Sequence, residues 1–303
     1  MSNLETLGEH RCFGGVVSFH EHHSEACDAP MRFGIYAPPA AERGPVPALY
    51  FLAGLTSTEE NFLVKGGAQR YAAEHGLMLV APDTSPRRLG LPGEGFYDPV
   101  TGVISPEVGF YGAGFYVDAT AEPYSAHYKM HSYVTRELPE IVEANFPARE
   151  DVRSISGHSV GGHGALTIAL KHPDLYRSVS AFAPICAPTQ VPYGREALST
   201  YLGPDEGSWR EYDASELVRE NPLPEGRTIL IDQGTADQFL KGGGSGDQPE
   251  DVRLSPDVFE EACAESGQSL ELRWQEGYDH GYYFVSTFME DHMKYHAAAL
   301  NAT

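Results

Sequence analysis

The sequence predicts an α/β fold with a mostly parallel central sheet, and three observations support this prediction. Short runs rich in Val, Ile, Leu and Phe recur along the 303 residues. Segments with apolar residues at helical spacing separate most of these runs. Two of the runs, within residues 46–55 and 76–83, are almost continuously apolar, as is typical of strands buried on both faces. Strands that alternate with helices form parallel sheets covered on both sides, so we expect helices on both faces.

The predicted elements follow one another along the chain and end at turn residues. Residues 14–23 and 31–39 alternate in polarity and are expected to form antiparallel edge strands. Later strands are expected at 46–55, 76–83, 152–157, 178–185, 227–234 and 269–277. Helices are expected at 59–75, 131–146, 161–172, 255–266 and 284–300. Since no repeat or linker divides the chain, we expect one domain over residues 1–303.

The composition excludes several classes of function. Lys and Arg number 21 against 43 Asp and Glu, a formal charge of −22, so a nucleic-acid partner is not expected. No stretch resembles a signal peptide or a membrane span, so a cytoplasmic protein is expected. The four cysteines have no C-x-x-C spacing, so neither a zinc site nor a disulfide framework is predicted. We expect no metal and no cofactor.

A serine between glycines marks the junction of a predicted strand and a predicted helix. Gly157-His158-Ser159-Val160-Gly161 follows the strand at 152–157. Such a G-x-S-x-G sequence fits a nucleophile elbow, in which glycines permit a tight turn and the serine projects at the helix N-terminus. There the free N–H groups favour a developing negative charge. We therefore predict that Ser159 is a nucleophile, rather than only a helix cap.

A serine nucleophile needs a base and a carboxylate that orients the base. In this fold the acid and the histidine follow the serine, each on a loop after a later strand. Asp237 and His280 occupy these positions. Asp232 lies inside its strand, and Asp279 directly precedes the histidine and would diverge from it. The sequence therefore predicts Ser159, Asp237 and His280 as a catalytic triad.

Other histidines fit structural roles better. His158 and His163 belong to the elbow and are expected to pack beside it. The run at residues 20–23 has no accompanying carboxylate or cysteine cluster and is expected to lie on the surface. His292 and His296 are four residues apart on the last predicted helix, and we expect them on its exposed side.

An acyl-transfer site also needs N–H donors for the oxyanion. One donor is expected to be Val160, directly after the nucleophile. The other is expected in the loop after the strand at 46–55, where Leu55 precedes a helix that Thr58 or Ser57 can cap. An ordinary strand-to-helix turn is the alternative for this loop.

Eight ordered segments resemble the S-formylglutathione hydrolases, the esterase D family. They are GLTSTEENF, APDTSPR, GAGFYVDAT, SYVTRELPEIVEANFP, GHSVGGHGAL, SVSAFAPIC, DQGTADQFL and QEGYDHGYYF, and the resemblance extends from about Cys12 to the C-terminus. It implies an α/β-hydrolase fold and a cytosolic homodimer that hydrolyses S-formylglutathione to glutathione and formate in formaldehyde detoxification. The family's triad falls on Ser159, Asp237 and His280, and its oxyanion donors on Leu55 and Val160.

Three departures from the family pattern affect the expected site. Ser57 stands where the family often has cysteine, which predicts resistance to thiol reagents. A longer segment precedes GAGFY, and Gly281 replaces a serine after the histidine. Residues 89–116 and 240–254 are expected to be long irregular loops, of which the first is the better candidate for a binding surface.

The expected substrate is a small acyl thioester or ester. We expect contacts from Gly54 and Ser57, and pairing of Lys65 or Arg87 with a glutathione carboxylate. A broad-specificity carboxylesterase or acyltransferase would use the same triad and is the alternative. A noncatalytic binding protein of the same fold is a third possibility, but it would normally lack a triad member.

Overall fold

A nine-stranded sheet forms the centre of the computed structural model, which describes residues 4–92, 112–240 and 253–302. Most of the two predicted irregular loops, residues 93–111 and 241–252, lies outside the described residues. The described strands are β1 (Glu5–Cys12), β2 (Gly15–Ser24), β3 (Ala29–Ala37), β4 (Val46–Leu52), β5 (Met78–Pro82), β6 (Ala148–His158), β7 (Val179–Phe182), β8 (Ile229–Gly234) and β9 (Leu270–Gln275).

The order of the strands is β1-β2-β3-β5-β4-β6-β7-β8-β9. The pairs formed by β1, β2, β3 and β5 are antiparallel, and every pair from β5 to β9 is parallel. The predicted α/β class, with antiparallel strands at one edge, is confirmed. The strand β1 was not predicted, because its sequence ETLGEHRC is polar along its length and nearly all of it is exposed.

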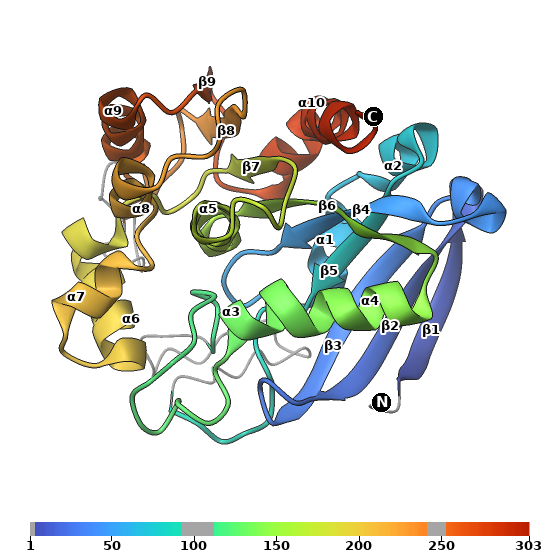
Figure 1. Ribbon diagram of the computed structural model, residues 1–303, viewed down its shortest axis with the longest axis horizontal. Helices are drawn as coiled ribbons and strands as arrows, with labels where there is room; N and C mark the ends of the chain where they lie inside the picture. Colours follow the sequence, from blue (N-terminus) through green and yellow to red (C-terminus); the bar gives the residue numbers. More distant parts are fainter. Residues whose placement is uncertain (1–3, 93–111, 241–252, 303) are drawn as a thin grey trace.

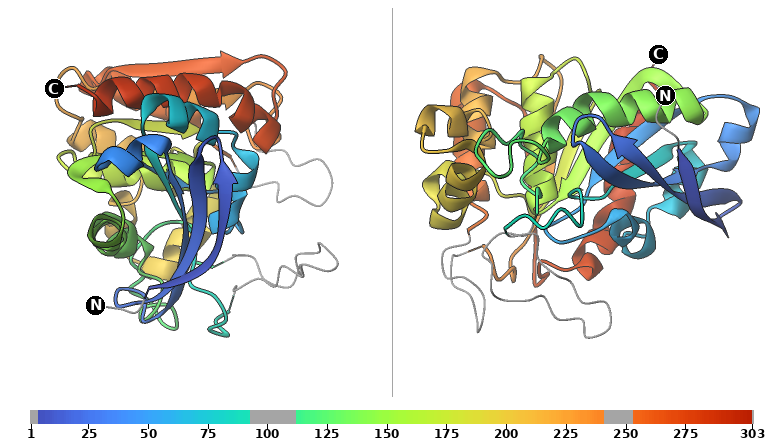
Figure 2. Two further views of the ribbon diagram at one scale, coloured as in Figure 1. Left: turned by 90° about the vertical axis from the view of Figure 1, so that its right-hand side faces the viewer. Right: turned by 90° about the horizontal axis from the view of Figure 1, so that it is seen from below.

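Helices cover both faces of this sheet. They are α1 (Glu59–Lys65), α2 (Gln69–His75), α3 (Met130–Ser132), α4 (Leu138–Asn145), α5 (Val160–Lys171), α6 (Pro192–Leu202), α7 (Glu206–Arg210), α8 (Ala214–Glu220), α9 (Pro256–Ser266) and α10 (Tyr282–Leu300). In Figures 1 and 2, α2 and α10 lie on one side of the sheet and α4 and α5 on the other. The group α6–α9 lies at the β8–β9 end, far from β1 (Figure 1).

The apolar patterns of the sequence correspond to depth in the fold. Every residue of β4 and β5 is buried, as their continuous apolar runs predict. In α5 every residue except Lys171 is buried, which makes it the central helix of its layer. The predicted helix at 59–75 is two helices, because Gly66 caps α1 and Gly67 has a φ of +67°.

The predicted surface position of the histidine run in β2 is correct for His23, which is exposed, and wrong for the other two histidines. His20 and His22 are buried, and His22 Nε2 lies 3.0 Å from Tyr133 Oη. Both side chains face the core because residues two apart share one face of a strand. The prediction did not take into account that an imidazole can be buried when a hydroxyl group forms a hydrogen bond with its nitrogen.

Candidate active site

The elbow at the end of β6 has the backbone conformation that a projecting serine requires. Ser159 has φ 58° and ψ −123°, and α5 begins at the next residue. A positive φ at a non-glycine residue is strained by about 1–3 kcal/mol and is often found at functional sites. A Cβ on Gly157 would lie 2.2 Å from Gly161 O, and one on Gly161 would lie 2.1 Å from Leu52 O. The two glycines are therefore required by backbone contact, and they bring β4 against the elbow.

The turn that follows β4, residues 53–57, lies directly against the serine. A Cβ on Gly54 would be 3.4 Å from Ser159 Cβ. Thr58 caps α1 in a reciprocal arrangement with Asn61, as one of the two predicted caps. The N–H of Leu55 has no backbone acceptor within residues 4–92, 112–240 and 253–302. Since the first N–H groups of a helix also lack intrahelical partners, Val160 offers a second donor beside Ser159.

Asp237 and His280 meet through a short hydrogen bond. The distance from His280 Nδ1 to Asp237 Oδ2 is 2.7 Å, and the Asp237 side chain is buried. Gln233 Nε2 donates to the same carboxylate oxygen at 3.1 Å, and the Phe239 N–H donates to the other at 2.8 Å. A carboxylate oxygen only accepts hydrogen bonds, so Nδ1 carries the proton and the Nε2 lone pair of His280 is left to act as a base.

The loops after β8 and β9 bring this pair to the elbow. A Cβ on Gly234 would lie 2.2 Å from Tyr278 O, so the two loops touch at their backbones. The His280 ring lies 4.6 Å, centroid to centroid, from the ring of His158, which directly precedes Ser159. The three predicted triad residues therefore gather at the carboxyl edge of the sheet, where parallel α/β folds place their ligands.

Two neutral imidazoles flank the serine on its inner side. Burial is the main cause that lowers the pKa of His158 well below its usual value, and it lowers the pKa of His163 to about 4. Backbone contacts act in the opposite direction, from His280 on the pKa of His158 and from Phe115 and Ile185 on that of His163, and they do not outweigh burial. Both side chains are buried beside the elbow, as predicted. No carboxylate within the described ranges acts on either ring to make it a base.

A second Ser–His–Asp group lies beneath α10. His292 Nε2 is 2.9 Å from Asp232 Oδ2, and its Nδ1 is 2.8 Å from Ser180 Oγ. Arg273 binds both oxygens of Asp232, and Gln275 donates to one of them. Ser180, His292 and Asp232 are buried, whereas Arg273 and Gln275 are partly exposed. Sequence reasoning missed this group because it placed His292 on the exposed side of the helix.

This buried group continues into a longer hydrogen-bond network. His296 lies 2.7 Å from Ser180 Oγ and 2.8 Å from Ser178 Oγ, through its two ring nitrogens. Ser154 and Ser156 of β6 are bonded to Ser178 and Ser180 at 2.6 and 2.9 Å. The predicted exposure of His292 and His296 is therefore wrong. Two histidines four residues apart on a helix, together with strands rich in serine, form the sequence pattern that could have indicated the burial of His292 and His296.

The four residues predicted to contact the substrate lie in different surroundings. Lys65 is exposed at the end of α1, with Nζ 5.9 Å from the ring centroid of Tyr282, two residues after His280. Arg87 is partly exposed, and its guanidinium group binds Asp83 and Ser57 O. Gly54 and Ser57 both belong to the turn beside Ser159.

The described residues contain neither a candidate metal site nor a candidate membrane-spanning helix. No three His, Cys, Asp or Glu side chains within the described ranges are grouped so that they would hold a metal ion. No helix in the same part of the chain has the length and apolar character needed to cross a bilayer.

Comparisons with known proteins identify the family of this chain. The Esterase family model matches residues 24–295. The chain is 50% identical to S-formylglutathione hydrolase of Mus musculus over 99% of both chains, and 47% identical to that of Paracoccus denitrificans over 98% of both. A solved S-formylglutathione hydrolase from Agrobacterium tumefaciens superposes with a TM-score of 0.85 at 43% identity, covering 98% of this chain and 99% of its own.

Proposed function

The chain belongs to the S-formylglutathione hydrolase family and is a serine hydrolase, and from this premise we propose that it hydrolyses S-formylglutathione to glutathione and formate. The observation that carries the proposal is the Asp237–His280 hydrogen bond of 2.7 Å beside the strained Ser159. In this role the enzyme would complete formaldehyde detoxification, because formate is the oxidised product released from the glutathione carrier.

In the first half of the reaction the serine takes up the formyl group. His280 Nε2 accepts the Ser159 proton while Oγ attacks the thioester carbonyl carbon. The oxyanion that forms is bound by the N–H groups of Leu55 and Val160. When the carbon–sulfur bond breaks, the thiolate leaves and takes the proton from His280, while Asp237 holds the ring in place.

In the second half water releases formate. His280 accepts a proton from a water molecule, whose oxygen attacks the formyl carbon of the Ser159 ester. The same two N–H groups bind the second oxyanion. The bond from carbon to Oγ then breaks, and His280 returns its proton to Ser159. Apart from the substrate and one water molecule, neither half of the reaction needs a further reactant.

Lys65 is the candidate partner for a glutathione carboxylate. Its ammonium group is exposed near Tyr282, at the side of the site formed by α1 and α10. Lys65→Met is expected to raise KM for S-formylglutathione several-fold and to leave KM for p-nitrophenyl acetate unchanged, because only the former carries carboxylates. An unchanged KM for S-formylglutathione would remove Lys65 from the proposal.

We also propose one domain over residues 1–303, a cytoplasmic location and a homodimer. The single nine-stranded sheet and the match to a relative along the full chain support the first. The other two follow from the family resemblance of the sequence segments described above. Light scattering at micromolar concentration tests the dimer, whose expected mass is twice the 33.1 kDa of the chain. A mass of one chain at all concentrations would contradict it.

A rate comparison between two substrates tests the proposed substrate. kcat/KM is measured for S-formylglutathione and for p-nitrophenyl acetate, with and without an alcohol acceptor. We expect kcat/KM for S-formylglutathione to be at least about 100-fold greater than that for p-nitrophenyl acetate, since only the thioester can form contacts through its glutathione part. Comparable values would favour a broad carboxylesterase, and transfer of the acyl group to the alcohol would favour an acyltransferase.

A further inference from the structure

The turn 53–57, which carries the Leu55 N–H, is held at both ends by side chains from other segments. Tyr116 Oη donates to Ala53 O at 3.1 Å. At the other end, Thr84 Oγ1 and Arg87 Nη2 both donate to Ser57 O at 2.7 Å. Three donors therefore bind the two carbonyls that bracket Leu55.

The backbone of this turn needs such support. Thr56, directly after Leu55, has a φ of +65°. For a β-branched residue this is a strained conformation. The only backbone hydrogen bond that spans the turn within the described residues joins the Ser57 N–H to Gly54 O at 3.2 Å. Without outside contacts the chain would relax toward negative φ, and the Leu55 N–H would change direction.

The three donors are themselves fixed. Arg87 binds both oxygens of Asp83, a buried carboxylate that also accepts from the Ser85 N–H. The Tyr116 ring packs against the backbone of α5, since a Cβ on Gly164 would lie 2.7 Å from it. The burial of the Tyr116 hydroxyl raises its pKa well above the usual value, so it remains a donor at any working pH. The turn is thus connected to α5, the helix that begins directly after Ser159.

From these contacts we infer that Tyr116, Thr84 and Arg87 are positioning residues that aim the Leu55 N–H at the oxyanion. This inference rests on the function proposed above, in which Leu55 is an oxyanion donor. It also gives Arg87 a role different from the glutathione contact that the sequence suggested, because its guanidinium is directed to Asp83 and Ser57 O. A misdirected N–H weakens binding of the transition state and leaves substrate binding unchanged.

Two near-isosteric variants test this role. Tyr116→Phe and Thr84→Val each remove one hydroxyl group that donates a hydrogen bond to the turn. Each is expected to lower kcat about 10- to 100-fold, with KM unchanged and with Ki for a trifluoromethyl ketone rising by the same factor. The burst amplitude with p-nitrophenyl acetate should stay at one per chain, because every molecule remains folded and active. A merely structural role would lower the burst amplitude and leave kcat per active site unchanged, which would overturn the inference.

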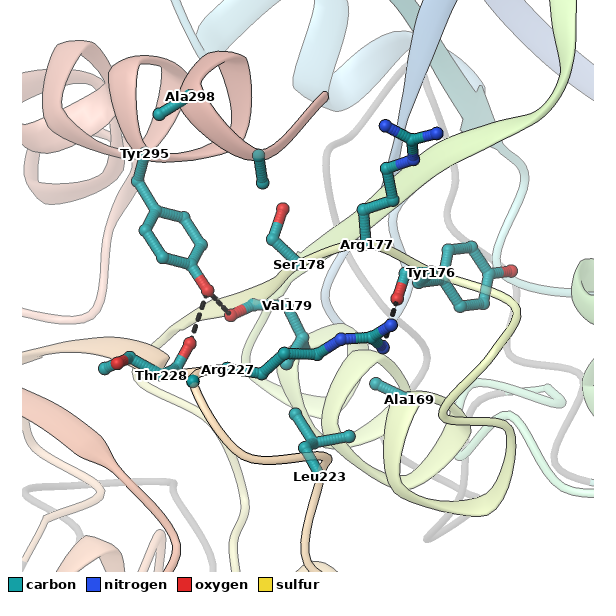
Figure 3. A pocket seen from close by; sticks show the side chains of 12 residues that line it. Ala169, Tyr176, Arg177, Ser178, Val179, Leu223, Arg227, Thr228, Tyr295 and Ala298 are labelled. Atoms are coloured by element: carbon teal, nitrogen blue, oxygen red, sulfur yellow. Dashed lines mark hydrogen bonds between the residues drawn. The ribbon is translucent and has the colours of Figure 1, made fainter. Parts of the chain in front are cut away.

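Tyr295→Phe is the matched control. Its hydroxyl lies 3.1 Å from Val179 O and 2.5 Å from Thr228 O, at the start of β7 and β8. Figure 3 shows Tyr295 beside Val179 and Thr228 in the lining of a pocket. Because β6, β7 and β8 are parallel, the starts of β7 and β8 lie at the edge opposite to the one where Ser159 follows β6. This variant is expected to lower the melting temperature with kcat unchanged. A loss of kcat equal to that of Tyr116→Phe would contradict a specific role for the turn.

Arg87→Met separates the two roles of Arg87. The positioning role predicts a lower kcat for both S-formylglutathione and p-nitrophenyl acetate, with both KM values unchanged. A higher KM for S-formylglutathione alone would show that Arg87 binds the substrate and would overturn its part of the inference. If Ser159→Ala keeps full turnover, the proposed function itself is wrong. If it is inactive while Tyr116→Phe is fully active, only the positioning role is wrong.

Discussion

Two regions of this protein hold a serine, a histidine and an aspartate together, and they have opposite properties. In the group at the carboxyl edge, Asp237 orients His280 beside Ser159, and the serine and the histidine are partly exposed. In the group beneath α10, Asp232, His292 and Ser180 form equally short hydrogen bonds, and all three are buried. Hydrogen-bond geometry alone therefore does not identify a catalytic group.

The proton positions in the buried group explain why its serine is not a nucleophile. Contacts with His292 and Arg273 outweigh burial and lower the pKa of Asp232 to about 2, while burial lowers the pKa values of His292 and His296. His292 is therefore neutral and donates from Nε2 to Asp232, so its Nδ1 accepts the Ser180 proton. The remaining contacts of Ser180 Oγ, with His296 and Ser156, must then be acceptor contacts. Both lone pairs of the Ser180 oxygen are occupied.

The comparison indicates what separates a structural hydrogen-bond network from the group that we propose to be catalytic. In the network beneath α10 the hydrogen bonds are donated in the direction of Asp232. The network holds α10 against β6, β7 and β8. At the carboxyl edge the strained elbow holds Ser159 outside such a network, next to two N–H donors. The predictions below test this contrast in order of decreasing effect.

The largest difference is expected between the two serines. Ser159→Ala should lower kcat/KM by at least about 1,000-fold, because the nucleophile is lost. Ser180→Ala should leave kcat/KM within about twofold but lower the free energy of unfolding by about 1–3 kcal/mol, because two histidine nitrogens lose their partner. Hydrolysis rates and urea denaturation measure the two effects. A loss of activity per folded molecule in Ser180→Ala would contradict the contrast.

The two aspartates should differ in the same way. Asp237→Asn is expected to lower kcat by up to about 10,000-fold with little change in stability, because His280 is no longer held in its active tautomer. Asp232→Asn should destabilise the fold by about 3–5 kcal/mol, because it leaves Arg273 without its buried partner. Denaturant unfolding and kcat at neutral pH are measured for both variants. Equal losses of activity would mean that Asp232 also serves the reaction.

The depressed pKa of Asp232 predicts how stability depends on pH. A carboxyl whose pKa is about 2 in the folded state and about 3.8 in the unfolded state stabilises the fold above about pH 4. This contribution, on the order of 2 kcal/mol, is lost as the pH falls from about 4 to about 2. The free energy of unfolding of the wild type minus that of Asp232→Asn should therefore shrink over this window. A difference that is constant between pH 5 and pH 2 would show that Asp232 is not ionised in the fold.

Thiol reagents should have the smallest effect. Burial raises the pKa of Cys27 and Cys263 to about 12, raises that of Cys186 well above its usual value, and raises that of Cys12. Position 57, in the turn beside Ser159, is a serine. Treatment with N-ethylmaleimide at neutral pH should therefore leave hydrolysis unchanged over an hour. Rapid inactivation would show that a cysteine contributes to the site, and Cys12→Ser would identify the partly exposed one.

Much of the fold could be predicted because hydrophobic patterning is local. The strands β4 and β5 and the helix α5 are recognisable from runs that must be buried whatever surrounds them. The polar strand β1 and the helices α6, α7 and α8 were not predicted, because their positions depend on packing against distant parts of the chain. For the site, the order Ser159, Asp237, His280 and the turns after their strands indicated the residues.

The sequence by itself determined which residues we propose for acyl transfer, since G-x-S-x-G and the chain order can be read along the chain. Only the tertiary structure decided which Ser–His–Asp group is accessible and which is locked beneath α10. It also decided that Arg87 binds Ser57 O in the turn 53–57. The physical reason is that burial and hydrogen-bond direction arise between segments far apart in the chain, as in the contacts of Tyr116 with Ala53 and of Asp232 with His292.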